Sequence, residues 1–281
     1  MDPVQSYRER VPAPEIADHV ASVWSLEVAP SSVAYEHRTV PNGSVEIAYE
    51  VGTDVLHVAG PQRGPTVARV APGTTLVGMR LRPGLAEPIL GRPASELVDV
   101  HVEADQVWGR GAATLAERLA ETGSGEGAAR LLEKEVTGRL AFASAPDPLV
   151  VEAVGRLQPW RRSGIGVQTA DLFLSPRQLR RRFVAALGYG PKTLQRLLRF
   201  QGFLALAQGR HDARVSLVRL AQRAGYADQA HLTRECGALT GLTPRAFFAE
   251  MWKSCGQTHD HEASFAWLRR ALSGSMPAAV A

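Results

Sequence analysis

The sequence predicts an α+β protein with a β-rich domain in its first half and an all-helical domain in its second half. The chain has 281 residues, which is enough for two domains. Short segments rich in Val, Ile and Thr fill residues 1–105 and are separated by turn residues. After residue 148, apolar residues recur every three to four positions, as they do in amphipathic helices. These three observations together indicate the fold class.

The strand candidates have high β propensity and partly alternating polarity. They cover residues 20–28, 44–51, 55–58, 66–70 and 75–82. Turn residues lie between them, as in Pro41-Asn42-Gly43 and Ala71-Pro72-Gly73. Several short strands at this spacing predict a small barrel or sandwich.

Helices are expected to follow these strands within the same domain. A helix start is predicted at residues 93–97 (PASEL), and residues 106–140 predict two helices that break at 122–127. The amphipathic face of residues 114–140 is a candidate surface for a homodimer. Residues 142–148 (FASAPDP) have no periodicity and mark a domain boundary. We therefore expect a β-rich domain over 1–145, a helical domain over 146–253, and a partly disordered tail over 254–281.

Charge divides the chain in the same way. Residues 148–253 hold 17 Lys and Arg against 6 Asp and Glu, whereas the rest of the chain holds 15 against 22. Most of the basic residues of the helical domain are arginines, which suit bidentate contacts to phosphate and guanine. The excess charge is compatible with a solvated helical surface and also with a nucleic-acid partner.

Several protein classes are excluded by composition. The longest uncharged apolar runs are far shorter than the ~20 residues that cross a bilayer, so no membrane partner is expected. The N-terminus has charges and prolines where a signal peptide has its apolar stretch, which predicts a cytoplasmic protein. The two cysteines, Cys236 and Cys255, are too few for a disulfide framework or a four-cysteine zinc site.

Two segments of the helical domain, at about 165–187 and 216–239, predict helix-turn-helix units. Each has a short helix, a tight turn and a second amphipathic helix. Ser175 followed by Pro176 predicts the start of the second helix in the first unit, and Asp228 does so in the second unit. Gly225 permits a left-handed backbone at the second turn.

The residues that remain outward on these second helices are candidate DNA contacts. In a helix-turn-helix, the N-terminal part of the second helix enters the major groove, where Arg reads guanine and Gln reads adenine. The alternative is a pair of basic helical hairpins without this role, but two units in the same order around one long helix favour DNA binding. The candidates are Ser175, Arg177, Gln178, Arg180, Arg181, Gln229, Ala230, Thr233 and Arg234.

The helical half resembles the double helix-turn-helix domain of AraC/XylS-type transcription regulators. The resemblance rests on LSPRQLRRRF, LGYGPKTLQRLLRF and LVRLAQRAGYADQAHLTRECGALTGLTPRAFF. It implies that the two second helices enter successive major grooves of double-stranded DNA, held apart by the helix at 192–207, and that RNA polymerase is a further partner. Arg177, Arg180 and Arg181 would supply contacts of the first unit, and Gln229, Ala230, Thr233 and Arg234 those of the second.

The sequence departs from the family pattern at four positions. Gln168 and Thr169 replace a usual Leu-Ala pair, Phe173 stands where a glycine is common, and Cys236 replaces a usual phenylalanine. These departures bear on the rigidity of the first unit and not on the fold. Cys236 is expected to be a buried, inert side chain.

Regulators of this type often carry an N-terminal cupin-like β-barrel that senses a ligand or dimerises. The pieces VPNGSVEI, AGPQ and VGMRLRPG resemble the N-terminal domain of a poorly characterised branch of the family. A barrel of this size can hold one small-molecule effector. The candidate lining residues are Trp24, Tyr35, Tyr49, Met79, Arg80 and Arg82. An arginine turned inward would favour an anionic or polar ligand.

No catalytic or metal site is predicted. The metal-ligand candidates of the first half are His37, Glu46, Glu50, His57 and His101, and no His-x-His pair occurs among them. We expect no metal, no cofactor and no enzyme activity. The sequence thus predicts a sequence-specific DNA-binding transcription regulator that responds to a small molecule. The alternatives are a β-barrel enzyme that modifies a small molecule while tethered to a DNA-binding domain, and a partner-binding module whose DNA domain no longer binds.

Overall fold

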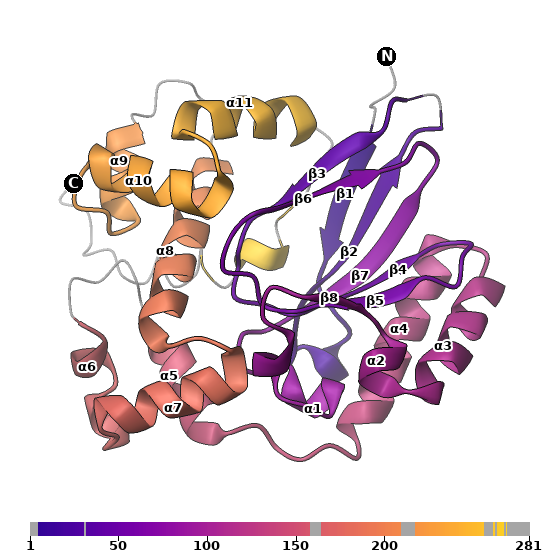
Figure 1. Cartoon of the computed structure of the whole chain (residues 1–281), viewed down its shortest axis with the longest axis horizontal. Helices are drawn as coiled ribbons and strands as arrows, with labels where there is room; N and C mark the ends of the chain where they lie inside the picture. The colour runs from indigo at the N-terminus through magenta and orange to yellow at the C-terminus, as the bar shows by residue number, and fades with distance from the viewer. Residues whose placement is uncertain are drawn as a thin grey trace.

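The computed structural model describes residues 5–30, 32–157, 164–208, 217–255, 261, 263–266 and 268. A β-rich half packs beside a helical half, as Figure 1 shows. The predicted fold class is therefore confirmed. None of the described helices is long and apolar enough to span a bilayer.

Two antiparallel sheets form the β-rich half. The larger sheet has the order β1 (Gln5–Arg10), β2 (Val20–Val28), β7 (Thr75–Leu81), β4 (Glu46–Glu50), β5 (Leu56–Ala59) and β8 (His101–Glu103). The smaller sheet pairs β3 (Tyr35–Thr39) with β6 (Thr66–Val70) and lies over one face of the larger sheet in Figure 1. All five predicted strand segments are strands. The sequence analysis missed β1 and β3, because their inward positions carry polar or aromatic residues instead of Val and Ile, and it missed β8, which is only three residues long.

Helices cover the other face of the larger sheet. They are α1 (Glu87–Leu90), α2 (Asp105–Trp108), α3 (Arg110–Glu121) and α4 (Gly125–Leu140), and two 3-10 turns, η1 (Pro14–Ile16) and η2 (Ala94–Leu97), accompany them. Leu115 and Leu119 of α3 and Leu132 of α4 are buried with the strand residue Ile47 in one core. The apolar side chains of 114–140, a candidate dimer surface, thus pack inside the domain.

A second, smaller core lies between the two sheets. Tyr7, Trp24, Leu26 and Val70 belong to it. Gly78 of β7 makes room for the indole ring, because a Cβ at this position would lie 2.5 Å from a ring carbon of Trp24. A glycine is therefore required at position 78, where the Trp24 ring lies against the backbone of β7.

The helical half contains all the helices that the sequence predicts. They are α5 (Pro148–Arg156), α6 (Ile165–Gln168), η3 (Ala170–Leu172), α7 (Pro176–Leu187), α8 (Pro191–Gln208), α9 (Leu217–Arg223), α10 (Gln229–Thr240) and α11 (Pro244–Cys255). Phe183 of α7, Phe200 and Phe203 of α8 and Leu232 of α10 are fully buried in one core. The long helix α8 thus joins the two helix-turn-helix units through a shared core.

The two halves share an extensive contact. Gln201 of α8 donates a buried hydrogen bond to the Pro41 carbonyl at 2.9 Å. Gly43 has φ +83°, and a Cβ there would lie 2.8 Å from the Leu194 side chain of α8. A side chain at position 43 would therefore both strain the backbone and push the two halves apart.

The segment after α11 also lies in this contact. We expected residues 254–281 to lie outside the helical pattern, yet Phe265 and Leu268 are buried in the core of the helical half. Ser264 donates its backbone N–H to Glu9 of β1 at 2.8 Å. The contact with Glu9 joins residues far apart in the sequence, so no local pattern predicts it. The rest of the predicted disorder, at residues 269–281, lies outside the described residues.

Candidate nucleic-acid interface and ligand cavity

The recognition helix of the first unit, α7, begins with a complete capping box. The Ser175 hydroxyl accepts from the Gln178 backbone N–H at 3.3 Å, and the Gln178 side-chain oxygen accepts from the Ser175 N–H at 2.9 Å. Pro176 occupies the first helical position, where its missing N–H costs nothing. Two of the predicted contact residues therefore also fix where α7 starts.

The predicted arginines of α7 all lie on its exposed side. Arg177, Arg180 and Arg181 are exposed, whereas Leu179 and Phe183 between them are buried. Within the described part of the chain, these three arginines form no ion pair. Their guanidinium groups are therefore available to an external anion.

The recognition helix of the second unit, α10, has the same organisation. The Asp228 side chain caps it by accepting from the His231 N–H at 2.6 Å. Gln229, Ala230, Thr233 and Arg234 are exposed, while Leu232 and Cys236 on the opposite side are fully buried. The Thr233 hydroxyl donates to the Gln229 carbonyl at 2.9 Å, which leaves its methyl group toward the surroundings.

Other arginines of the helical half are used inside the protein. Arg196 pairs with Glu235 at 2.6 Å, Arg182 pairs with Asp147 at 2.5 Å, and Arg156 pairs with Glu152 at 2.6 Å. The contrast separates arginines that hold the helices together from those that face outward on α7 and α10.

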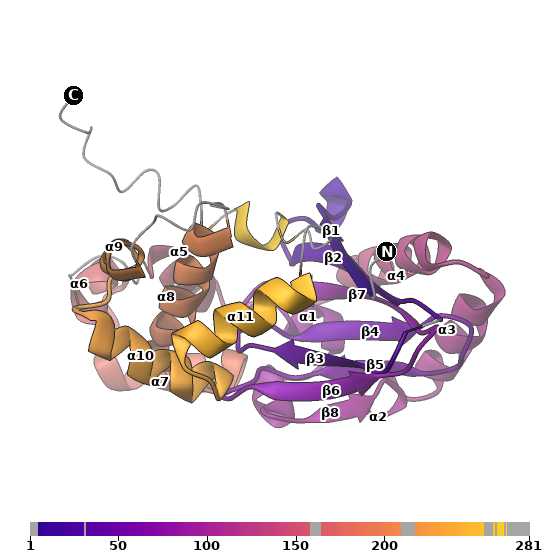
Figure 2. The same cartoon turned by 90° about the horizontal axis from the view of Figure 1, so that it is seen from above.

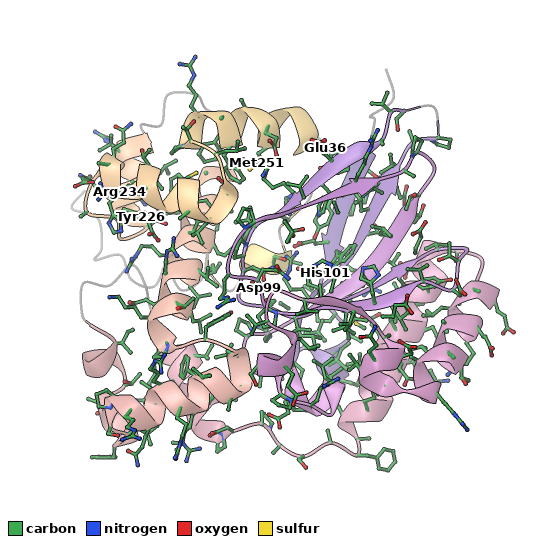
Figure 3. All side chains as sticks on the ribbon, viewed as in Figure 1. Glu36, Asp99, His101, Tyr226, Arg234 and Met251 are labelled. Atoms are coloured by element: carbon green, nitrogen blue, oxygen red, sulfur yellow. The ribbon has the colours of Figure 1, made fainter. Side chains whose placement is uncertain are left out.

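The two recognition helices lie near opposite ends of α8, as Figure 1 shows. Figure 2, seen from above, shows that both helices nevertheless lie on the same side of α8, at one edge of the helical half. Figure 3 shows Arg234 of α10 at the end of the helical half that is far from the β-rich half. This arrangement lets one DNA face meet both helices.

The first unit differs from the second in its first helix and turn. Instead of one continuous helix, α6 ends at Gln168 and the 3-10 turn η3 follows. At the junction, the Thr169 hydroxyl donates to the Ile165 carbonyl at 2.9 Å. Phe173 then adopts φ +52° and is 94% exposed. A left-handed backbone at a phenylalanine is strained, which is the structural consequence of the residue that replaces glycine.

Cys236 is a packing residue. It is fully buried, and burial raises the pKa of its thiol. Its sulfur lies 3.6 Å from the Thr240 hydroxyl. A thiol with a raised pKa is a poor nucleophile, which fits the expected inert role.

A cavity of about 360 Å³ lies between the two sheets of the β-rich half. Two predicted ligand residues, Trp24 and Arg80, line it. The five metal-ligand candidates, His37, Glu46, Glu50, His57 and His101, line it as well. Among the described residues, however, no three His, Cys, Asp or Glu side chains are placed to hold a metal ion together.

Arg80 lies at the centre of a buried polar cluster. Its Nη1 is 2.9 Å from Glu9 Oε1, and its Nε is 2.8 Å from Glu46 Oε1. It also donates to the Tyr7 hydroxyl at 3.4 Å and to the Ser264 hydroxyl. Burial by itself would raise the pKa of Glu9, but the Arg80 charge and hydrogen bonds from His261 and Ser264 outweigh it and lower that pKa.

Two histidines of the cavity, His37 and His57, have lowered pKa values. Burial, more than any neighbouring charge, lowers the pKa of His37 to about 4. Burial also lowers the pKa of His57, and the nearby His101 lowers it further. Neither imidazole of His37 and His57 therefore adds a positive charge to the cavity at neutral pH.

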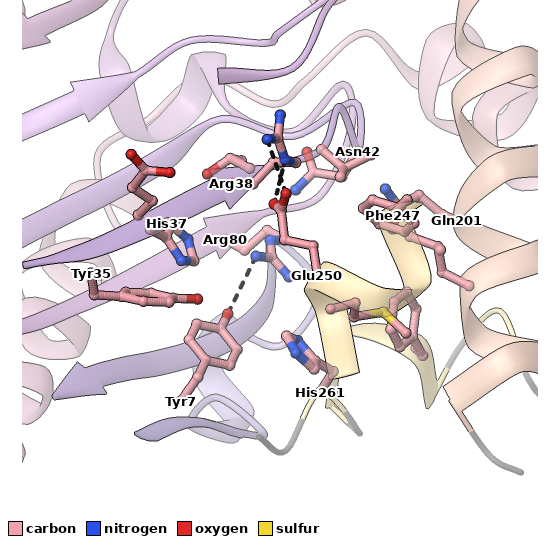
Figure 4. A pocket seen from close by; sticks show the side chains of 16 residues that line it. Tyr7, Tyr35, His37, Arg38, Asn42, Arg80, Gln201, Phe247, Glu250 and His261 are labelled. Carbon is pink, nitrogen blue, oxygen red and sulfur yellow. Dashed lines mark hydrogen bonds and ion pairs between the residues drawn. The ribbon is translucent and has the colours of Figure 1, made fainter. Parts of the chain in front are cut away.

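The other predicted ligand residues lie elsewhere. Tyr35 lines a smaller pocket of about 130 Å³ between β3 and α11, shown in Figure 4, and Arg82 lines a third cavity of about 380 Å³ beside α5. Tyr49 and Met79 are fully buried in the core under the helices. The expectation that these two line a ligand pocket is corrected, because alternation along β4 and β7 directs them to the opposite face from Glu46 and Arg80.

Several residues of this site were not among the predicted ligand-lining residues. Tyr7 and Glu9 are on β1, where the buried positions Gln5, Tyr7 and Glu9 alternate with more exposed ones. Period-two alternation of polar residues is the only sequence signal for this strand. His261 stacks on Tyr7 with ring centroids 4.7 Å apart, and nothing in the sequence indicated that contact.

The strand β3 joins the cavity to the second helix-turn-helix unit. His37 lines the cavity, and the next residue, Arg38, forms a two-pronged ion pair with Glu250 of α11 at 2.6 and 3.2 Å. Arg38 also donates to the carbonyl of Thr240, the last residue of α10, at 3.0 Å. Figure 4 shows the Arg38–Glu250 pair beside His37. A displacement of β3 would thus act directly on α10 and α11.

Two segments of the chain match sequence models of protein families. Residues 8–103 match the sequence model of a family described as "Domain of unknown function (DUF6597)", and residues 169–250 match one described as "Helix-turn-helix domain". No curated protein matches the chain.

Among solved structures, the chain is similar to ToxT from Vibrio cholerae. A crystal structure of ToxT from strain O395 has a TM-score of 0.45 and 10% identity, covering 87% of this chain and 98% of that chain. A ToxT structure from strain SCE256 with a bound unsaturated fatty acid has a TM-score of 0.41 and 8% identity, covering 92% and 97%.

The quoted sequence motifs, the paired helix-turn-helix units and the family match at 169–250 agree with one another. Residues 169–250 therefore form an AraC-type helix-turn-helix domain, and residues 8–103 match the DUF6597 family.

Proposed function

We propose that the chain binds a specific DNA sequence through α7 and α10 together and that a small molecule in the β-rich half controls this binding. The observation that carries the DNA part is the set of exposed arginines without ion-pair partners among the described residues, on two capped helices at one side of α8. The direct contacts we propose are Ser175, Arg177, Gln178, Arg180, Arg181, Gln229, Ala230, Thr233 and Arg234.

The proposed signal runs from the cavity through β3. A ligand changes DNA affinity only by binding one arrangement of the molecule better than another. Because His37 faces the cavity and Arg38 holds α10 and α11, a ligand that displaces β3 would alter how the second unit sits relative to the first.

The β-rich half is proposed to bind its ligand without converting it. The charged groups at the centre of the cavity, Glu9, Glu46 and Arg80, are engaged with one another, which suits a fixed binding wall better than proton transfer. We propose that the protein acts without metal or cofactor in the bacterial cytoplasm and that RNA polymerase at the regulated promoter is its further partner.

Selection of bound fragments from genomic DNA by the full chain tests this proposal. We expect a recurring sequence with two short conserved blocks about one helical turn apart, one for each recognition helix. Recovery of fragments with no shared sequence would contradict sequence-specific binding. Repeating the titration at several salt concentrations should give an affinity that falls steeply as salt rises, since phosphate contacts release counterions.

A further inference from the structure

We propose that the cavity between the two sheets takes a small organic cation, such as a protonated primary amine attached to an apolar group. This inference rests on the proposed function, because it names the ligand class of the same regulator. It also reverses the expectation that an inward arginine favours an anionic ligand, because the structure shows what that arginine already holds.

The guanidinium of Arg80 has little capacity left for a ligand. Four of its hydrogen bonds go to Glu9, Glu46, Tyr7 and Ser264. A guanidinium has five N–H donors, so one remains, and an incoming carboxylate could make a two-pronged contact only by displacing one of these partners. The Glu9 side chain is fully buried, and those of Arg80 and Glu46 are each 17% exposed.

The charge balance around Arg80 is negative. One guanidinium faces two carboxylates, Glu46 in the cavity wall and Glu9 behind it, and a third carboxylate, Glu50, also lines the cavity. His261 lies 3.8 Å from Glu9, on the side of the cluster away from Glu46 and Glu50, and is not among the lining residues. The other cationic residue in the lining is Arg69 on β6, which is exposed and lies opposite Glu36 in the β3–β6 ladder. A cation in the cavity would therefore be attracted, whereas an anion would be repelled.

An acceptor for that cation is in place. Glu46 Oε1 accepts from Arg80 and from Asn42, but no donor to Glu46 Oε2 is recorded among the described residues. An ammonium group donates three hydrogen bonds and accepts none, which matches a carboxylate oxygen that still has free lone pairs.

The rest of the wall suits an apolar group with one polar atom. Tyr7 and Trp24 stack with ring centroids 6.1 Å apart along one side of the cavity. The Trp24 indole N–H and the His37 Nδ1 are buried without a partner in the described part of the chain. Such atoms cost free energy unless they are satisfied; the indole N–H is a donor, so it requires water or an acceptor atom on the ligand other than the ammonium.

Titration calorimetry of the full chain at pH 7 with benzylamine, benzyl alcohol and benzoate tests the proposal, because the three probes share a ring and differ in charge. Protonated benzylamine should bind at least about tenfold more tightly than benzyl alcohol, as expected for one charge-assisted hydrogen bond. Benzoate should show the weakest binding. Benzoate binding as tightly as benzylamine, or no heat from benzylamine up to about 10 mM, would overturn the proposal.

Two variants locate the effect. Glu46→Gln should lower benzylamine affinity at least about tenfold. Glu50→Gln should lower it less, and it leaves the Arg80 cluster intact in case Glu46→Gln folds poorly. The matched control is Glu27→Gln, an exposed carboxylate on β2 outside the cavity, which should bind benzylamine like the unaltered chain. Equal loss in Glu27→Gln and in both cavity variants would overturn the cavity as the site.

DNA binding by the same preparations separates this inference from the proposed function. Sequence-specific DNA binding with no preference for benzylamine refutes only the cation. If the unaltered chain does not bind DNA sequence-specifically, the proposed function is refuted, whatever the calorimetry shows.

Discussion

The same side chain has opposite roles in the two halves of this protein. Arginines 177, 180, 181 and 234 are exposed and unpaired within the described residues, whereas Arg80 is buried between two carboxylates and a tyrosine. Water solvates a guanidinium at the surface at little cost, so the recognition helices can keep theirs free for a nucleic-acid partner. A guanidinium shielded from water is stable only beside its counter-charges. Arg80 therefore has a structural role, and the carboxylates around it give the cavity wall a negative charge.

The largest expected effect is on the buried side of this comparison. Arg80→Met should lower the free energy of unfolding by about 3–5 kcal/mol, because it leaves Glu9 and Glu46 buried without a cation. Urea denaturation followed by circular dichroism measures the change. The double variant Arg80→Met/Glu9→Gln should recover part of the loss. A loss below about 1 kcal/mol would show that the cluster is solvated and that the contrast with the surface arginines is wrong.

The next effect is on the exposed side. Arg180→Ala and Arg181→Ala should each weaken binding to a selected DNA fragment by about 1–3 kcal/mol and leave unfolding nearly unchanged. A mobility-shift titration measures the affinity. Arg130→Ala is the matched control, since Arg130 is an exposed arginine on α4 of the β-rich half whose side chain is 74% exposed. Unchanged DNA affinity in both α7 variants would remove the first unit from the interface.

Sequence reasoning placed the helical half more accurately than the β-rich half. Ser175, Asp228 and Gly225 mark helix starts and a turn through local chemistry, so each could be identified from its neighbours. The outward positions of α7 and α10 followed because Leu179 and Leu232 fix the buried side. These features depend on contacts within a few residues.

The cavity depends on contacts between distant residues. Glu9 and Ser264 are hydrogen-bonded although they are 255 residues apart in the sequence, and no local pattern predicts that contact. Tyr49 and Met79 were placed on the wrong face because aromatic and sulfur side chains suit a pocket and a core equally well. Only the pairing of β4 with β7 decides which face each residue takes.

A pH effect sharpens the comparison inside the cavity. His37 has a pKa of about 4 in the folded chain, below its ordinary value of 6.5, so the unfolded chain binds more protons between these values. Folding stability should therefore fall as pH drops from 6.5 toward 4, by at most about 1.4 kcal/mol per pH unit from this group. Denaturation of His37→Gln at pH 5–6.5 should show a shallower slope. Glu9 also loses stability in acid, but below the ordinary carboxyl pKa. His57 and His19 have lowered pKa values too, so the difference in slope between the unaltered chain and His37→Gln is what measures the His37 contribution.

The smallest effect concerns the difference between the two helix-turn-helix turns. Phe173→Gly should raise the free energy of unfolding by about 0.5–1 kcal/mol, because it relieves a left-handed phenylalanine that is exposed and makes few contacts. Thermal denaturation measures the change. Phe142→Gly is the control, since Phe142 is equally exposed at 95% but does not have a positive φ, and it should not be stabilised. Destabilisation by Phe173→Gly would mean that the ring stabilises the turn.

The central claim is that two separate helices read one DNA face. Footprinting of the full chain on a selected fragment tests it most directly when repeated with Arg180→Ala/Arg181→Ala and with Gln229→Ala/Arg234→Ala. We predict two protected major-groove segments about 10 base pairs apart, of which each variant loses a different one. One protected segment, or the same segment lost in both variants, would contradict the account.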